Sequence, residues 1–340
     1  MTDKTSGGSH PEKCASLGEF GRIREFLAPL TLGHPDSLNL RDDAALLTVP
    51  EGDDLVVTTD TIVRHVHFLA KDGPGDIASK LMRVNLSDLA AKGAAPLGYS
   101  LSLALPVSVD DGWVRAFAER LAEEQATFGI RLIGGDSVRT EGPEVLTINA
   151  YGLIPKGQMM RRDGAKAGDL VYVTGTIGDG ALGLMAARGD FIGLPGAAEL
   201  VRRYQIPEPR LALGEGVRGL VNGAMDVSDG LVGDLAAMAG TSGLGAVLHS
   251  HLIPLSDPAS ELLAGDPDLM ISVLTGGDDY ELLLTVAAEN KAAFERKAEA
   301  TGIPVTAIGE ITAAYTSGMV AVLDADGNRV NLDNLKYTHI

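Results

Sequence analysis

The sequence predicts a two-domain protein in which both halves mix strands with helices. The chain has 340 residues, enough for about two domains at the usual ~150 residues each. Short apolar runs of strand length alternate with longer helical stripes along both halves. The stretch 155–168 carries Pro, Gly and several basic residues but few apolar ones, so we expect the domain boundary there. The predicted domains are 18–156 and 157–340, preceded by a mobile, polar extension over 1–17.

In the N-terminal half, the apolar residues of 20–30 recur on one helical stripe. Asp110 or Asp111 is a suitable N-cap, and Gly93 is a suitable helix stop. The residues before Pro106 alternate between polar and apolar, as expected of a strand. The predicted helices are 20–30, 76–92 and 110–128, and the predicted strands are 55–63, 99–105, 130–133 and 145–154. We expect the first strand to end near Asp60.

The C-terminal half opens with a strand and then alternates helices with strands to its end, an α+β pattern. The segment 324–327 begins like a calcium loop but lacks the third spaced ligand and the terminal Glu, so it is interpreted as a hairpin turn. The predicted strands are 170–173, 246–248, 281–286, 305–308 and 320–323, and the predicted helices are 199–204, 210–221, 231–239 and 290–301.

Charge and composition narrow the class of partner. The chain has 28 basic and 46 acidic residues, a net charge of −18, which argues against nucleic acid or an anionic membrane as partner. A single cysteine, Cys14, excludes an internal disulfide and fits a reducing compartment. No apolar run reaches the ~20 residues that span a bilayer. We therefore expect a cytoplasmic protein.

The most informative pattern is a set of short segments bearing Asp, most of which follow or interrupt an apolar run. If the fold brings these carboxylates together, each pair at contact range repels by roughly 4 kcal/mol at an effective dielectric near 20, so cations must hold them. Oxygen ligands of this kind suit magnesium, which usually accompanies phosphate. The segments are 41–44, 58–61, 85–88, 134–137, 226–230 and 276–280.

Taken singly, each segment is a weak signal, because Asp is common at helix caps and strand ends. Asp229, for instance, could simply cap the helix that follows it. Two segments stand out. Asp88 lies inside an apolar helix, with Asn85 one turn before it, and a carboxylate there needs a partner. The segment 276–281 places three acids beside two glycines at the start of an apolar strand, which is costly without a ligand.

The common nucleotide and metal motifs are absent or unconvincing. There is no P-loop and no kinase H-R-D or D-F-G motif. One G-x-G-x-x-G, at 214–219, lies inside a helical pattern. Another, at 178–183, follows a strand, but no second strand ending in an acidic residue comes after it, so a Gly-rich turn is favoured over a dinucleotide site. His65 and His67 share one strand face, but no third ligand lies near them, which favours a substrate contact or a packed surface.

Together, the segments resemble thiamine-monophosphate kinase, and the match runs collinearly from about Gly18 to Tyr337. That family shares a superfamily with aminoimidazole ribonucleotide synthetase, selenophosphate synthetase and a hydrogenase-maturation protein. The resemblance implies an N-terminal α/β domain that pairs across a homodimer, a C-terminal α+β domain, and ATP with several magnesium ions between them. It also implies the reaction of ATP with thiamine monophosphate to give thiamine diphosphate. The segments that carry it are 42–47, 58–68, 84–91, 133–136, 173–179, 225–231 and 276–282.

The resemblance also implies roles for individual residues. Asp229 would bind a magnesium ion apart from the others, and Asp278 stands where the family commonly has Glu, which shortens its reach to the substrate. The remaining metal ligands would be Asp43, Thr58, Thr59, Asp60, Asp88, Asp136 and Asp226. ATP would contact Gly135, Asp136, Arg162 and Ser228, and thiamine monophosphate would contact His67, Asp278 and Tyr337.

The chemistry agrees with the residues available. A phosphate monoester has a second pKa near 6, so its oxygen is already deprotonated at neutral pH and needs no general base. The sequence offers no convincing catalytic His or Cys pair, and no acid–base residue is assigned. The difficulty is the approach of two polyanions, which magnesium held by carboxylates would relieve.

Two alternatives remain open. Selenophosphate synthetase would need a reactive Cys beside Lys in a Gly-rich loop, and here Cys14 follows Lys13 without that loop. A non-catalytic protein that binds divalent metal would hold its ions without nucleotide, whereas the kinase should need phosphate oxygens to complete the ligand set.

Overall fold

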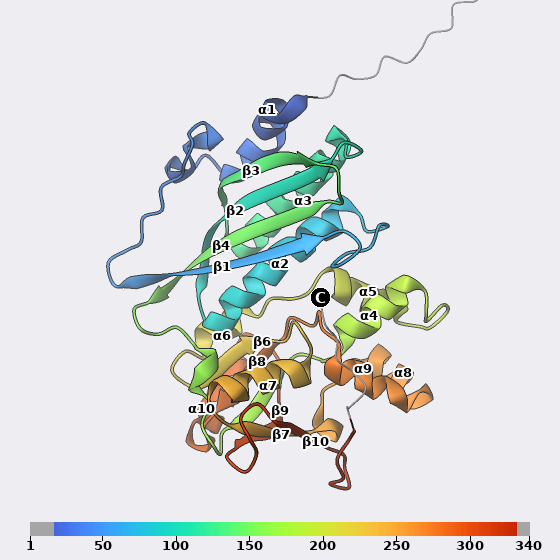
Figure 1. The fold of residues 1–340 in the computed structure, drawn as a ribbon. Helices are drawn as coiled ribbons and strands as arrows, with labels where there is room; N and C mark the ends of the chain where they lie inside the picture. Colours follow the sequence, from blue (N-terminus) through green and yellow to red (C-terminus); the bar gives the residue numbers. More distant parts are fainter. Residues whose placement is uncertain (1–16, 332–340) are drawn as a thin grey trace, which may run out of the picture.

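The computed structural model describes residues 17–331 as two lobes stacked end to end (Figure 1). The predicted extension, Cys14 within it, and Tyr337 lie outside the described residues, apart from Leu17. A four-stranded sheet forms the upper lobe and a six-stranded sheet the lower one. Within 17–331, no helix is both long and apolar enough to cross a membrane.

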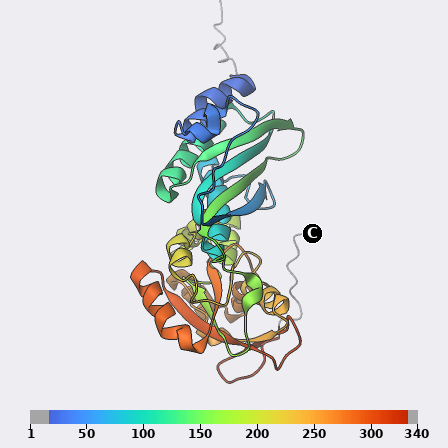
Figure 2. The same cartoon turned by 90° about the vertical axis from the view of Figure 1, so that its left-hand side faces the viewer.

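The upper sheet has the strand order β1-β4-β2-β3, with β2 and β3 parallel and the other pairs antiparallel. Two long helices, α2 (Pro74–Lys92) and α3 (Asp111–Phe128), cover one face, while the other face lies open (Figures 1 and 2). Short helical turns from α1 (Gly18–Arg22) to Thr31 pack beside α3. The strands are β1 (Asp53–Val63), β2 (Ala95–Pro106), β3 (Leu132–Thr140) and β4 (Val145–Pro155).

The lower sheet has the order β10-β7-β9-β5-β8-β6, with only β10 and β7 parallel. Alternate side chains of its strands enter two separate cores, Val171 on one face and Tyr172 on the other. Its strands are β5 (Leu170–Thr174), β6 (Gly223–Asp226), β7 (Gly245–His249), β8 (Leu282–Val286), β9 (Val305–Thr312) and β10 (Val320–Leu323).

Helices pack on both faces of the lower sheet. The first core takes in α4 (Asp179–Arg188), α5 (Ala197–Gln205), α7 (Leu231–Thr241), α8 (Asp257–Gly265) and α9 (Met270–Thr275). The second takes in α6 (Leu211–Gly216), α10 (Lys291–Thr301) and the end of α2. Helix α2 is therefore shared between the lobes, which explains why it is buried on almost every side.

Most predicted elements are confirmed. Helix α2 ends at Gly93, whose φ of 70° is left-handed, and Asp110 caps α3 by accepting a hydrogen bond from the Trp113 N–H at 2.8 Å. The turn at 324–327 is a hairpin closed by a bridge between Leu323 and Arg329. The Gly-rich segment 178–183 follows β5 as expected, but all of it except Gly178 belongs to the first turns of helix α4, so the connecting turn lies before it.

Three expectations about elements were wrong. Strand β1 ends at Val63, as predicted for 55–63, but Asp60 lies inside it and not near its end. Strand β3 does not stop at Ile133 but runs through Gly134–Asp136 to Thr140. Pairing with β4 and β2 holds these polar and glycine residues extended, overriding their turn preference. The helix expected over 210–221 is only α6, residues 211–216, and β6 was not expected at all.

Candidate functional site

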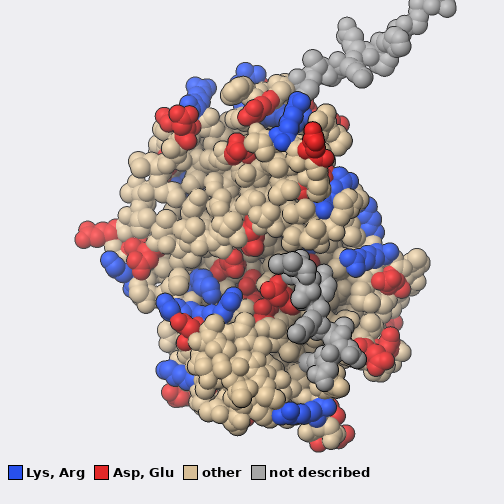
Figure 3. Space-filling model, in the orientation of Figure 1, with Lys and Arg blue, Asp and Glu red and all other residues tan. Residues whose placement is uncertain are grey.

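Four carboxylates from both lobes meet where α2 crosses the lower sheet. Asp60 lies on the inward face of β1, and Asp88 lies on α2. Asp226 ends β6, and Asp229 follows in the loop before α7. The charges of Asp88, Asp226 and Asp229 all act on Asp60, so the four form one group, called here the inter-lobe acid cluster. Figure 3 shows acidic side chains gathered at this waist of the molecule.

Neighbouring polar groups hold the cluster in place. The Thr58 hydroxyl, on the same strand β1 as Asp60, donates to the Asp88 carboxylate. The Ser87 hydroxyl donates to Asp226 Oδ2 at 2.6 Å, across the lobes. The Asn85 side-chain oxygen accepts from the Asp60 backbone N–H at 3.0 Å. The partner expected for Asp88 is therefore the Thr58 hydroxyl. Helix α2 contacts Asp60 of the upper lobe through Asn85 and Asp226 of the lower lobe through Ser87.

Asp60, Asp88 and Asp226 have raised pKa values and are therefore protonated more readily than usual. Burial, then the negative charges of Asp88, Asp226 and Asp229, raise the pKa of Asp60 to about 7. Burial and the charge of Asp88 raise the pKa of Asp226 to about 6. Burial raises the pKa of Asp88 as well, although the Thr58 hydroxyl opposes this. The cluster is therefore a site where negative charge is costly and a cation would be stabilised.

Two cationic side chains flank the acids. The Lys92 ammonium donates to the Ala224 carbonyl at 3.0 Å, and burial lowers its pKa while the nearby Asp226 opposes the shift. The Arg162 guanidinium lies close enough to act on both Asp88 and Lys92. A phosphate entering the cluster would meet these cations, which is the arrangement expected for a polyanionic ligand.

The segment 276–281 lies beside the cluster and carries a further acid, Asp278. Its Tyr280 ring lies within the electrostatic reach of Asp60, Asp226 and Asp278. The Tyr280 hydroxyl donates to Asp278 Oδ1 at 3.2 Å, and Lys80 of α2 donates to Asp278 Oδ2 at 3.0 Å. Asp278 is thus held at the lobe boundary.

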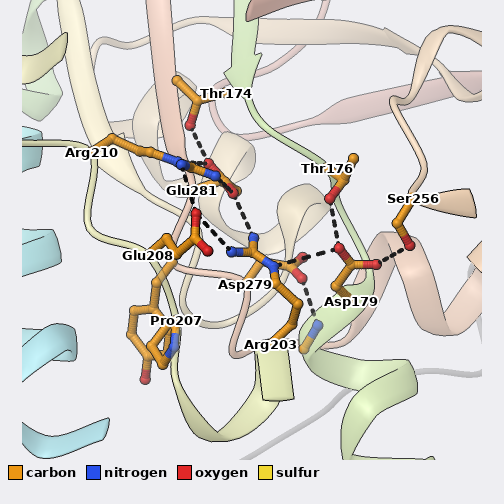
Figure 4. A network of polar contacts seen from close by, with 12 residues as sticks. Thr174, Thr176, Asp179, Arg203, Pro207, Glu208, Arg210, Ser256, Asp279 and Glu281 are labelled. Carbon is orange, nitrogen blue, oxygen red and sulfur yellow. Dashed lines mark hydrogen bonds and ion pairs between the residues drawn. The ribbon is translucent and has the colours of Figure 1, made fainter. Parts of the chain in front are cut away.

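The other two acids of this segment have structural roles, so the ligand we expected for them is not needed. Asp279 accepts the backbone N–H groups of Gly178 and Gly180 at 2.8 and 2.9 Å. Glu281, which is fully buried, accepts hydrogen bonds from Thr174, Arg203 and Arg210 (Figure 4). The protein's own donors therefore satisfy these carboxylates, and the N–H groups of Gly178 and Gly180 at the start of α4 bind Asp279.

Three proposed ligands lie elsewhere in this chain. Asp60 shares one row of the sheet with Ile148, Leu101 and Gly135. Since Ile148 and Leu101 are core residues, that row faces α2, and Asp136, one residue on, lies on the open face. Three strand spacings, about 14 Å, also separate β1 from β3. Within one chain, Asp136 therefore does not join the inter-lobe acid cluster.

Asp43 and Thr59 also belong to the open side. The Thr59 hydroxyl donates to Asn149 Oδ1 at 2.7 Å on the open face. Asp43 is exposed in a coil and, with Gly135 and Asp136, lines a hollow of about 490 Å³ that is backed by apolar Ile23 and Leu27. An apolar wall beside glycine and carboxylate is a suitable place for a nucleotide base.

The remaining assigned residues lie near the cluster. Ser228 lies two residues after Asp226, and its carbonyl accepts the Asp278 N–H at 3.0 Å. His67 Nδ1 accepts the Val63 N–H at 3.1 Å, while the His67 carbonyl accepts from Lys80 and Tyr204. The N-cap of α7 is Gly230, and Asp229 lies one residue before it. Asp234, in the first turn of α7, accepts the N–H groups of Ser228 and Asp229 at 3.0 and 3.1 Å.

Sequence reasoning missed the polar residues of α2 that reach the lower lobe. Lys80, Ser87 and Lys92 contact Asp278, Asp226 and the Ala224 carbonyl. Lys80 and Ser87 are separated by seven residues, two turns of one helix face, so polar residues recurring along an otherwise apolar helix were the available signal.

The donor set of the cluster fits magnesium, because it consists of carboxylate and hydroxyl oxygens. Among residues 17–331, no three acidic, His or Cys side chains form a ready-made ion site. Magnesium held by one or two of these carboxylates would complete its shell with water and with phosphate oxygens of a ligand.

Comparison with known proteins agrees with this architecture. Residues 41–154 match the AIR synthase related protein N-terminal domain, and residues 166–321 match the corresponding C-terminal domain. The chain is 44% identical to thiamine-monophosphate kinase of Caulobacter vibrioides, over 86% of this chain and 83% of that protein. It superposes on thiamine-monophosphate kinase of Stenotrophomonas maltophilia with a TM-score of 0.81 at 38% identity, covering 93% and 99% of the two chains. It also superposes on the structure described as AaThiL complexed with AMPPCP and TMP, with a TM-score of 0.73 at 28% identity, covering 96% of this chain and 97% of that one.

Proposed function

Because the chain belongs to the thiamine-monophosphate kinase family, we propose that it transfers the terminal phosphoryl group of ATP to thiamine monophosphate, forming thiamine diphosphate. One observation carries the proposal. Carboxylates from both lobes converge where two cationic side chains flank them, and burial makes their negative charge costly. Such a place is suited to a ligand that brings phosphate and magnesium together.

The chain's own residues would align and neutralise the reactants. Asp60, Asp88 and Asp226 would hold magnesium at the lobe boundary, with Thr58 keeping Asp88 in position. Magnesium held there would supply positive charge that offsets the charge of the phosphates. Lys92 and Arg162 would attract the phosphates from the lower side of the cluster. The acceptor phosphate is already deprotonated, so no side chain needs to remove a proton.

We propose that ATP contacts Gly135, Asp136, Arg162 and Ser228, and that Asp43, Thr59, Asp136 and Asp229 complete the magnesium ligands. The apolar hollow beside Gly135 and Asp136 supports the first assignment. The charge of Asp229 acts on Asp60, which supports Asp229 as one of the magnesium ligands. For the substrate we propose His67 and Asp278, and also Tyr337, which rests on the sequence resemblance alone.

We propose a homodimer formed through the open face of the upper sheet. That face and its rim leave apolar side chains in solvent, with Val57 57% exposed, Val138 48% and Leu46 66%. A second copy is the occupant that the open face suggests, because exposed apolar surface commonly marks an interface. We also place the domain boundary at 156/157, supported by two sheets that occupy 53–155 and 170–323. The single cysteine supports a cytoplasmic location.

A coupled assay of ADP release tests the proposed reaction. Purified protein with ATP and magnesium is given thiamine monophosphate, free thiamine or an aminoimidazole ribonucleotide precursor. We expect ADP with thiamine monophosphate and none once magnesium is chelated. ADP release only with the aminoimidazole precursor would refute the assignment in favour of another superfamily activity.

A further inference from the structure

Lys80 of helix α2 is a buried lysine that contacts both lobes. Its side chain is 3% exposed, so its ammonium group is buried at the lobe boundary. That group donates to Asp278 Oδ2 at 3.0 Å and to the His67 carbonyl at 3.0 Å. It also lies 3.7 Å from the centre of the Tyr204 ring. One cation from α2 thus joins a turn of the upper lobe to two elements of the lower lobe.

The residues that Lys80 joins are the two substrate contacts proposed among the described residues. It fixes the backbone of His67, whose ring is held separately by the Val63 N–H. It fixes the carboxylate of Asp278, whose other oxygen accepts from the Tyr280 hydroxyl. Both oxygens of Asp278 are therefore directed before any substrate arrives, which lowers the cost of ordering them on binding.

The backbone of Asp278 is also constrained. Its φ of 70° is uncommon for a residue other than glycine. The Asp278 N–H donates to Ser228, and a Cβ on Gly180 would stand only 2.4 Å from the Asp278 carbonyl. Asp278, which is shorter than the Glu common in the family, thus lies in a constrained segment, and Lys80 is the cation that directs its carboxylate.

Helix α2 also links Lys80 to the inter-lobe acid cluster. Lys80 and Asp88 are eight residues apart, about 12 Å along the helix axis. A single rigid element therefore sets the spacing between the proposed metal ligands and the Lys80–Asp278 pair. This spacing is fixed whether or not the lobes move, because both residues belong to one helix.

We infer that Lys80 is a positioning residue for the substrate, acting through Asp278 and the His67 turn rather than by touching the phosphates. The inference rests on the proposed function, since it assigns Lys80 to the acceptor side of the same reaction. Loss of a purely structural ion pair would lower the stability of the protein and change the KM for ATP and for thiamine monophosphate alike. Loss of a positioning residue should raise the KM for thiamine monophosphate alone.

The test compares Lys80→Met, Lys80→Arg, Asp278→Asn and the double variant Lys80→Met/Asp278→Asn in steady-state assays. We expect Lys80→Met to raise the KM for thiamine monophosphate about tenfold, the equivalent of one strong hydrogen bond, with the KM for ATP unchanged. Lys80→Arg should recover part of the loss. The double variant should be no worse than the poorer single variant, because the two residues act as one unit.

Lys71→Met is the matched control, because Lys71 also reaches across the lobes but donates to the Ala187 carbonyl, away from Asp278. It should leave the KM for thiamine monophosphate unchanged. An active wild type whose Lys80→Met variant keeps its KM for thiamine monophosphate, or loses ATP affinity equally, would overturn the inference alone. An inactive wild type would instead overturn the proposed function.

Discussion

At the scale of single residues, burying the inter-lobe acid cluster lowers the folding stability of the protein, which is expected of a site that binds a ligand. Asp60 and Asp226 are buried beside like charges, which raises both pKa values toward neutrality. A fold selected only for stability would not gather carboxylates in this way. Thr58 and Ser87 hold the carboxylates in place without neutralising them.

Replacing Asp60, Asp88 or Asp226 by Ala should abolish kinase activity, because each removes an oxygen that a cation needs. The fold should survive, since burial of these carboxyl groups costs stability. We expect ADP release at background level at saturating magnesium, with an unchanged or raised urea midpoint. Asp53→Ala, on the same strand β1 but at its start, is the control. Normal turnover by any of the three cluster variants would remove that residue from the site.

Magnesium binding with nucleotide should release protons at mildly acidic pH. In the free protein, the raised pKa values of about 7 for Asp60 and about 6 for Asp226 keep part of their carboxyl groups protonated at pH 6. Cation binding requires the carboxylates, so affinity should rise with pH up to about 8 and then level off. Calorimetry in two buffers of different ionisation enthalpy measures the protons. Equal release at pH 6 and pH 8.5 would contradict these shifts.

At the scale of elements, α2 organises both lobes, while the segment 276–281 is braced from the C-terminal side. Glu281 bonds to Arg203 at 2.7 Å and to Arg210 at 2.6 and 2.7 Å, and none of its side chain is exposed. The segment that carries Asp278 is therefore held in place where it enters strand β8. Rigid support of this kind is what a binding residue requires.

Glu281→Gln should destabilise the protein by about 1.5–3 kcal/mol, because it removes the fully buried negative charge that accepts hydrogen bonds from Arg203 and Arg210. The cost is less than that of an unpaired charge, because Arg210 keeps Glu208 as an ion-pair partner and Arg203 keeps Asp179. Urea unfolding followed by circular dichroism measures the change. Glu25→Gln, in an exposed pair with Arg24, is the control and should stay within about 0.5 kcal/mol. A loss at Glu281 as small as that of the control would show that the network is not supporting the strand.

The sequence was a good guide to elements and a poorer guide to their edges. The apolar stripe and Gly93 located α2 closely, because burial and a helix stop are both local signals. The extent of β3 could not be predicted, since Gly134–Asp136 become extended only by pairing with β2. Likewise, Asp279 and Glu281 resembled ligands until their partners, distant in sequence, were seen.

At the scale of the molecule, two faces of one sheet separate the proposed ligands. Asp60 faces α2, whereas Asp136 and Thr59 lie on the open face. The resemblance suggested a single group of carboxylates, and sequence order carries no information about which face each would occupy. The chain alone thus assembles part of the proposed site, and the open face is where a second copy would meet it.

Val57→Asp should weaken the proposed dimer, because it places a charge at an exposed apolar position of the open face, on the edge strand β1. Light scattering coupled to size exclusion should report two copies for the wild type and one for the variant. Val107→Asp is the control, since Val107 is 79% exposed and lies beyond the end of β2. A wild type that elutes as a single copy would rule out this interface.

The most direct test of the central claim is equilibrium dialysis of magnesium with and without a non-hydrolysable ATP analogue. The inter-lobe acid cluster offers carboxylates but no complete ion site, so magnesium should bind weakly alone and as several ions once the nucleotide is present. Asp88→Ala should remove part of that nucleotide-dependent binding. Equally tight magnesium binding without nucleotide would instead identify a non-catalytic metal-binding protein and contradict the account.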